Sequence, residues 1–465
     1  MDPPPKLPDP KTVSELFRRK KEIPSVDTSV TFSFFAQWFT DSFLRTDPHS
    51  WQKNTSNHGI DLCQIYGLTQ RQTDALRAKK GGRLRGQLID GEEYPAFLYE
   101  RRHPKADLTI RPEFKDLYNA ATFERVVATA SEEHKEWMFA VGLENGNSTI
   151  GHTILNIVFL REHNRIAGIL ADEYKGQEAW DDDRLFETTR NIMIAVFLKL
   201  VIEEYIKHIG PNDFPIEAVP FAAEKAAWNR PNWITIEFNL LYRWHSLVPD
   251  EIGTGRERLG PRQFINNNPL VVERGVEALL AQCSRDPAGR IGLHNTPAVL
   301  MEPLGRDPVG VMPKTIAMMR QARLASFNDY RAHFSLPRLK SYTELTADTE
   351  LARELENLYG SIDNLEWYVG LFAEDHPPAM MMGRLLGTMV GYDAFTQALT
   401  NPLLDRRVYN ADSFTPTGLE IIEKTTCLEQ IVKRNSKYSD FAYAQFRIAK
   451  PGRLARIRRW LRCAA

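Results

Sequence analysis

The chain has 465 residues, of which 43% are hydrophobic and 26% are charged, and its formal net charge is −1. This composition is typical of a globular protein, and the balanced charge argues against nucleic-acid binding. The length allows one large domain or two smaller ones. The four cysteines lie far apart in the sequence, which argues against a CxxC metal site or a disulfide framework.

The N-terminal segment MDPPPKLPDP has no apolar stretch, so we expect no signal peptide. No uninterrupted apolar run reaches the ~18 residues that predict a transmembrane helix. We therefore expect a reducing, cytoplasmic protein. Residues 1–10 are rich in proline and predict an extended arm.

The first informative segment spans residues 27–46 and contains FSFFAQWFTDSFLRT, which predicts a helix rich in aromatic residues. Gln37 and Asp41 are four residues apart and would share one face of that helix. In isolation such a pair is typical of a polar edge that faces solvent. The segment GGRLRGQLIDGEEYPAF at 81–97 predicts a hairpin that turns at Asp90 and Gly91, and it is the clearest β signal in the chain.

Helical patterning dominates the rest of the chain, at 152–174, 181–208, 266–292, 380–400 and 418–434. The segment at 181–208 has acidic residues at its start and Gly210–Pro211 after its end, so it predicts one long helix. The motif LREHNR at 160–165 indicates either buried charge pairs or a solvated charge cluster. The sequence thus predicts a mainly α fold with minor, short β-hairpins.

The segment ITIEFNLLYRWHSLVPD at 234–250 surrounds Tyr242 and His245 with apolar and aromatic residues. If the segment is helical, the spacing of three places both side chains on one face. A neutral imidazole on such a face can ligate haem iron, and a nearby tyrosine can carry a radical formed by oxidised haem. The alternative is a hydrogen-bonded histidine in the core.

Several motifs resemble one family in the right order. YRWHSLVPD is similar to the YHWHPLxPD segment of prostaglandin endoperoxide synthases, the cyclooxygenases of the haem peroxidase–cyclooxygenase superfamily. FSFFAQWFTDSFLRT resembles that family's FxFFAQHFTHQFFKT, and HGIDLCQIYG and LREHNR also have counterparts. The resemblance spans roughly residues 6–447 and lacks the family's epidermal-growth-factor-like and membrane-binding modules. It implies an animal-type haem peroxidase fold, with residues 11–447 as the catalytic domain.

The resemblance assigns roles to individual residues. His245 would be the proximal ligand of the haem iron, and Tyr242 the radical that takes hydrogen from a fatty acid. Gln37 would contact peroxide on the distal side of the haem. Asp41 stands where the family has its distal, acid–base histidine, and Arg243 stands where the family has another histidine.

The same comparison implies a substrate channel lined by Tyr205, Ile206, Ile209, Phe238 and Ala394. Ala394 occupies the position of the serine that aspirin acetylates in the family. Tyr368 resembles a residue near the proximal histidine and would help to hold haem. The alternative for the channel residues is ordinary helix core.

We therefore expect a haem-dependent dioxygenase that oxygenates unsaturated fatty acids with molecular oxygen through a tyrosyl radical. One alternative is a haem peroxidase that uses hydrogen peroxide or a lipid hydroperoxide with small reductants. The other is a haem-binding protein without catalysis. The family's mammalian peroxidases bond haem covalently through acidic side chains, and we find no equivalent of those residues near Asn145–Thr149, so we expect non-covalent haem b. Cyclooxygenases form dimers, which makes a homodimer one option.

The tail at 448–465 contains KPGRLARIRRWLRCAA, in which apolar and arginine side chains would occupy different faces of a helix. Residues 450–465 could bind peripherally to an anionic bilayer. They could equally dock on the protein's own surface or stay unfolded.

Overall fold

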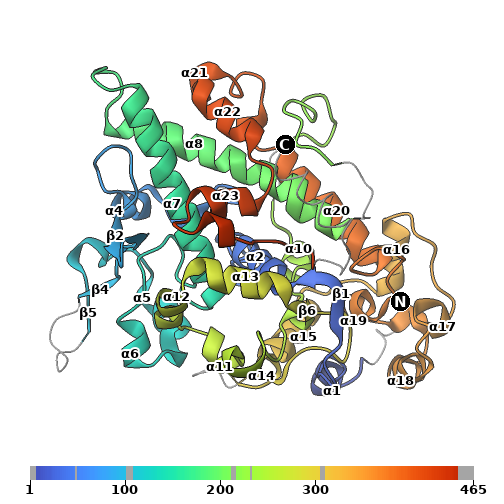
Figure 1. The fold of residues 1–465 in the computed structure, drawn as a ribbon. Coiled ribbons are helices and arrows are strands. Elements are labelled where there is room, and N and C mark those ends of the chain that lie inside the picture. Colours follow the sequence, from blue (N-terminus) through green and yellow to red (C-terminus); the bar gives the residue numbers. More distant parts are fainter. Residues whose placement is uncertain are drawn as a thin grey trace.

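The computed structural model describes residues 7–47, 50–100, 108–210, 216–230, 233–303 and 309–448. Within these ranges the fold is mainly helical, as the sequence predicted, with small antiparallel sheets of two strands. The longest helices are α7 (Ile150–Glu173), α8 (Asp182–Leu200) and α20 (Arg384–Leu399). In Figure 1, α8 crosses the upper half of the molecule, and α7 descends from the top past its middle.

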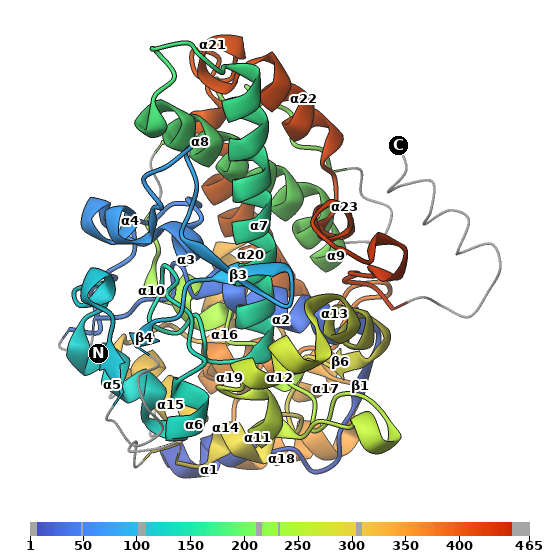
Figure 2. The same ribbon diagram turned by 60° about the vertical axis from the view of Figure 1, so that its left-hand side comes forward.

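Helix α2 (Val30–Thr40) lies in the middle of the molecule, and Figure 2 shows α7 crossing it. It begins after Ser29, whose hydroxyl accepts a hydrogen bond from the Phe32 N–H. Every residue of α2 except Gln37 is buried, as expected for a helix covered on nearly all sides. The helix is shorter than the predicted segment because strand β1 (Pro24–Ser29) precedes it and pairs with β6 (Pro287–Gly289).

The predicted long helix at 181–208 is confirmed. α8 continues through a π-helical turn (Val201–Ile206) into α9 (Lys207–Ile209) without a break. Asp181 caps its start by accepting a hydrogen bond from the Arg184 N–H. A π turn adds one residue to the helical repeat and rotates the side chains that follow, and such turns occur frequently at functional sites.

The predicted hairpin is also confirmed, as β2 (Gly86–Ile89) and β3 (Glu92–Pro95). Asp90 and Gly91 have φ angles of 52° and 81°, the left-handed values that a tight two-residue hairpin turn needs. The sheets β1–β6 and β4 (Tyr99–Glu100)–β5 (Thr109–Ile110) were not predicted. Their strands are too short to show an alternating pattern.

Two predicted helices are each broken in two. The segment at 418–434 forms α22 (Pro416–Lys424) and α23 (Leu428–Arg434), because side chains of Gln430 and Glu204 accept the backbone N–H groups of Thr426 and Leu428. The segment at 266–292 forms α12 (Asn268–Arg274) and α13 (Val276–Arg285), and the break falls at Gly275, whose φ is 82°.

The LREHNR motif forms buried charge pairs, the first of the two interpretations. The fully buried carboxylate of Glu162 accepts hydrogen bonds from Arg165 on its own helix and from Arg434 and Asn435 at the end of α23. Burial alone would raise the pKa of Glu162, but its hydrogen bonds and ion pairs with the two arginines lower it to about 2. The cluster therefore ties the C-terminal part of the described chain to α7.

The other helices of the described ranges pack around these elements. No helix of these ranges is both long and apolar enough to cross a membrane. The α-helices not yet named are α1 (Pro10–Glu15), α3 (Cys63–Tyr66), α4 (Gln70–Leu76), α5 (Ala120–Val126), α6 (Glu132–Lys135), α10 (Ile236–Leu241), α11 (Pro261–Phe264), α14 (Ala298–Met301), α15 (Val311–Gln321), α16 (Phe327–His333), α17 (Tyr342–Leu345), α18 (Thr349–Tyr359), α19 (Trp367–Ala373) and α21 (Ala411–Phe414).

Candidate functional site

Tyr242 and His245 lie on a turn, not on one helix face as predicted. Helix α10 ends at Leu241, and a 3₁₀ turn begins at His245. Trp244, between them, has ψ of 57°, which is far from a helical value. A long-range contact explains the difference. The buried Tyr368 hydroxyl donates a hydrogen bond of 2.9 Å to the Arg243 carbonyl, which fixes the turn from helix α19.

His245 has the properties of an available ligand. Its Nδ1 is buried and has no hydrogen-bond partner in the part of the chain that the structure describes. Burial lowers the pKa of His245 to about 3, and the positive charge of Arg243 contributes. The imidazole is therefore neutral at physiological pH, the form that binds haem iron.

Arg243 has a role in the structure, although the family has histidine there. Its guanidinium donates to the Asn239 Oδ1 and the Thr315 Oγ1, both at 2.9 Å. Together with the Tyr368 contact, these bonds fix the turn that carries His245. Tyr368 thus supports the turn through its backbone, and its predicted part in haem binding stays a prediction.

The Tyr242 ring lies in an aromatic cluster. Its ring centre is 4.7 Å from that of Phe238, 4.9 Å from that of Trp244 and 6.3 Å from that of Phe43. The hydroxyl is buried and has no hydrogen-bond partner among the described residues. Burial raises the pKa of the Tyr242 phenol well above its usual value, with a contribution from the charge of Asp393. Tyr242 is therefore a neutral phenol in apolar surroundings.

The predicted channel residues are all buried. Tyr205, on the π turn, packs against Phe32, Phe35 and Phe39 of α2, and its hydroxyl also lacks a partner among the described residues. Phe238 contacts Tyr242 directly. The others lie on helices next to these two: Ile206, Ile209 and Ala394. Burial fits both an apolar channel and plain core, so their role as channel residues stays a prediction.

Gln37 of α2 and Asp41, which directly follows the helix, lie one helical turn apart as predicted, and the Asp41 N–H donates to the Gln37 carbonyl. Gln37 is the one exposed side chain within α2. The Asp41 Oδ2 is 2.7 Å from the Nε2 of His152, a residue near the start of α7. His152 was not predicted as a site residue. Its only signal in the sequence is a histidine near the start of a mainly apolar helix.

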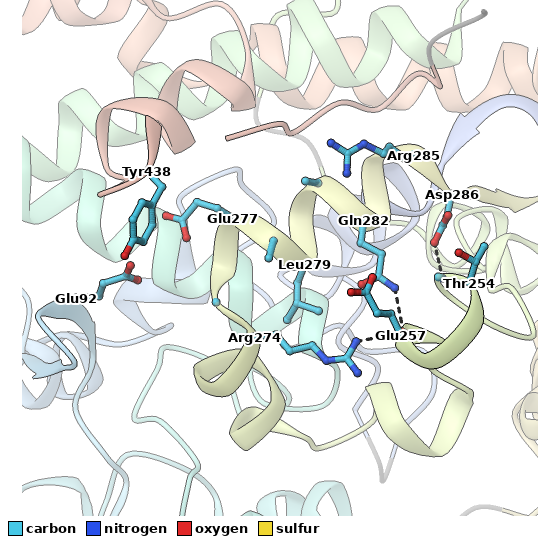
Figure 3. A pocket seen from close by; sticks show the side chains of 14 residues that line it. Glu92, Thr254, Glu257, Arg274, Glu277, Leu279, Gln282, Arg285, Asp286 and Tyr438 are labelled. Carbon is cyan, nitrogen blue, oxygen red and sulfur yellow. Dashed lines mark hydrogen bonds between the residues drawn. The ribbon is translucent and has the colours of Figure 1, made fainter. Parts of the chain in front are cut away.

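A groove of about 800 Å³ lies beside α13 and the loop at 253–257, and Figure 3 shows the charged side chains on its walls. Glu92 and Glu277 at one end both pair with Arg161, at 2.9 and 3.6 Å. None of the predicted site residues lines this groove. The groove is therefore separate from the candidate site.

The residues of the candidate site fit a haem group. His245 offers a neutral imidazole with an unpaired nitrogen, and Gln37 offers a polar side chain that α2 leaves uncovered. A neutral imidazole is the proximal ligand of haem in peroxidases, and the polarity and hydrogen-bond donors of the distal pocket tune the chemistry of the iron.

Comparison with known proteins supports this assignment. Residues 43–446 match the family described as animal haem peroxidase. The chain belongs to this family. It is 34% identical over 441 residues to prostaglandin G/H synthase 2 of Gallus gallus, covering 94% of this chain and 68% of that protein. It is 33% identical over 447 residues to prostaglandin G/H synthase 1 of Rattus norvegicus, and this match covers 95% of this chain and 68% of that protein.

Solved structures share the fold at lower identity. Peroxidase A from Dictyostelium discoideum has a TM-score of 0.75 and 20% identity, with 96% of this chain and 91% of that chain covered. The fatty acid alpha-dioxygenase of Arabidopsis thaliana has a TM-score of 0.73 and 17% identity, with 95% and 77% covered. Both confirm the predicted haem peroxidase fold.

Proposed function

We propose that this chain is a haem-dependent dioxygenase that oxygenates unsaturated fatty acids through a radical on Tyr242. The observation that carries the proposal is the Tyr242 hydroxyl, which is buried without a hydrogen-bond partner among the described residues and surrounded by aromatic rings. An unpaired buried hydroxyl costs stability. Its presence in a chain that is about a third identical to prostaglandin G/H synthases supports a chemical role.

The cofactor in this proposal is haem b held without covalent bonds. His245 would ligate the iron, and the contacts of Arg243 and Tyr368 would keep its turn in place. Gln37 would face the distal side. Haem supplies the oxidising power that removes an electron from the Tyr242 phenol.

The steps that follow belong to Tyr242 and its surroundings. Because the raised pKa keeps the phenol protonated, forming the neutral phenoxyl radical removes a proton as well as an electron, and bound, oxidised haem would accept both. This radical takes a hydrogen atom from an activated C–H bond of the fatty acid and returns to the phenol. The substrate carbon radical then adds molecular oxygen, and the resulting peroxyl radical takes a hydrogen atom back from the Tyr242 phenol, which gives the hydroperoxide and restores the tyrosyl radical. The cluster of Phe43, Phe238 and Trp244 keeps water from the radical.

The test combines an absorption spectrum with oxygen uptake. The purified protein should show a Soret band and should consume oxygen with some members of a panel of unsaturated fatty acids. Tyr242→Phe should keep the Soret band and lose oxygen uptake. A protein without a Soret band, or a Tyr242→Phe variant that takes up oxygen at the wild-type rate, would refute the proposal.

A peroxidase acting on small reductants is the second candidate. It is favoured by the hydrogen bond between Asp41 and His152, because peroxide cleavage needs an acid–base group. Rapid peroxide-dependent oxidation of a small phenol, without oxygen uptake on any fatty acid, would put this candidate first.

Membrane contact and assembly are further parts of the proposal. Residues 450–465 lie outside the described residues. Their sequence supports binding to anionic lipid, and a variant that ends at Phe446 should then sediment less with anionic vesicles. A homodimer would be seen by analytical ultracentrifugation.

A further inference from the structure

His152 and Asp41 form a contact between two helices that are far apart in the sequence. Asp41 follows the last residue of α2, and His152 is the third residue of α7. The Nε2–Oδ2 distance is 2.7 Å. The side chain of His152 is 2% exposed, whereas that of Asp41 is 23% exposed. The Asp41 carboxylate therefore lies nearer to the protein surface, and the His152 imidazole is buried beneath it.

The hydrogen bonds of His152 indicate which nitrogen carries the proton. A carboxylate oxygen can only accept, so the Nε2 that lies 2.7 Å from Asp41 Oδ2 carries a hydrogen and donates it. The Oγ1 of Thr149 accepts the His152 backbone N–H at 3.3 Å and lies 2.9 Å from Nδ1 on the other side of the ring. Asp41 Oδ1 then remains without a partner among the described residues.

The surrounding packing holds this arrangement in place. Trp38 of α2 donates to the Asn156 Oδ1 of α7 at 2.8 Å, one helical turn beyond His152. Phe34 covers Gly151 so closely that a Cβ there would lie 2.2 Å from the phenyl ring. The two helices thus cannot shift relative to each other without breaking close contacts. The hydrogen bond from His152 fixes Oδ2 of Asp41, and because the carboxylate is rigid this also fixes the position of its Oδ1.

Resting on the proposed function, we propose that His152 is the positioning residue for Asp41, which acts as the distal acid–base group. In the conversion of a hydroperoxide ROOH to the alcohol ROH, the hydroperoxide proton moves from one oxygen to the other as the O–O bond breaks. Asp41 Oδ1 accepts this proton and returns it to the leaving RO oxygen. Haem held by His245 would supply the two electrons of this reduction and would accept the second oxygen atom. His152 keeps its own proton throughout and holds the carboxylate in the required orientation.

Cyanide binding tests the proposal without turnover. Hydrogen cyanide must give a proton to a nearby base before cyanide binds the iron, and the Soret shift reports the rate. Asp41→Asn should slow binding by about 100-fold or more, the usual contribution of a positioned acid–base group. His152→Leu frees the Asp41 carboxylate to rotate and should slow cyanide binding by about 10-fold or more. His152→Gln keeps an N–H donor and should stay within about threefold of wild type.

His163 provides the matched control on the same helix. It is equally buried, and its two nitrogens contact the Tyr66 hydroxyl and the Gly82 carbonyl. His163→Gln should affect thermal stability but leave the cyanide rate unchanged. In the Asp41→Asn background, His152→Leu should cause no further loss, because His152 acts only through Asp41. The reduction rate of a fatty-acid hydroperoxide should follow the same order across these variants.

The possible outcomes separate this inference from the proposed function. A wild-type cyanide rate in His152→Leu, with the Soret band and oxygen uptake intact, would overturn the inference alone. Equal slowing in His152→Gln and His152→Leu would also overturn it, because the imidazole would then have to move a proton itself. Absence of a Soret band would overturn the proposed function, and the role of Asp41 and His152 with it.

Discussion

Replacing Tyr242 with phenylalanine should make the protein slightly more stable while abolishing oxygenation. The change removes a single hydroxyl that is buried and has no hydrogen-bond partner among the described residues. Burying such a group costs about 1–3 kcal/mol. The ring contacts with Phe43, Phe238 and Trp244 are unchanged by the substitution. The free energy of unfolding should therefore rise by roughly 1–3 kcal/mol.

Thermal unfolding and oxygen uptake measure the two effects. In a chain of this length, each kcal/mol shifts the melting temperature by about 1 °C, so the expected increase is about 1–3 °C. Tyr66→Phe is the matched control, because the Tyr66 hydroxyl is buried but bonded to the Nδ1 of His163 at 2.8 Å. It should lower stability by about 1 kcal/mol and leave oxygen uptake intact. A Tyr242→Phe variant less stable than wild type would show that the hydroxyl has a structural partner.

Three further predictions concern single ionisable side chains. His245→Ala should lose the Soret band while far-ultraviolet circular dichroism stays unchanged; full haem retention would place the iron ligand elsewhere. Burial, with the charge of Glu237, raises the pKa of Asp393 to about 7. The protonated Asp393 carboxyl therefore contributes its full stability to the fold below about pH 4, and this contribution is lost as pH rises through 7. Wild type should lose stability between pH 5 and 8, and Asp393→Asn should lose less by on the order of 2 kcal/mol, a value reduced to allow for the partial exposure of Asp393. Equal pH profiles of the two proteins in urea unfolding would contradict this. Because the pKa of Glu162 is lowered to about 2, its ionised carboxylate stabilises the folded state above about pH 4.5, and this stabilisation is lost as pH falls toward 2. Glu162→Gln should therefore lower the free energy of unfolding by about 3 kcal/mol at pH 7 and by much less near pH 2. If the stability difference between variant and wild type stays constant across this range, the charge is not its cause.

Much of the fold was determined by local sequence. The hairpin at Asp90 and Gly91 needs only two residues that tolerate left-handed backbone angles between short strands. Helices α2 and α8 begin directly after Ser29 and Asp181, whose side chains accept hydrogen bonds from N–H groups three residues later. Such signals act within one turn of the chain, so the sequence is sufficient to find them.

The identities of the main site residues also came from the sequence. Tyr242 and His245, like Gln37 and Asp41, were predicted through motifs that resemble those of this family. The geometry of the motif was predicted wrongly, as one helix face. Tyr368, more than a hundred residues later, bonds the Arg243 carbonyl and fixes the turn. A contact of that kind has no trace in the local pattern.

The partner of Asp41 was decided by tertiary structure alone. A hydrogen bond between Asp41 and His152 requires α2 and α7 to pack at one particular distance, which depends on Phe34 lying over Gly151 and on Trp38 bonding Asn156. The sequence places a carboxylate where the family has histidine, and an imidazole 111 positions later. Only side-chain packing between the two helices brings them within 2.7 Å, because no periodicity within either helix encodes the distance to the other.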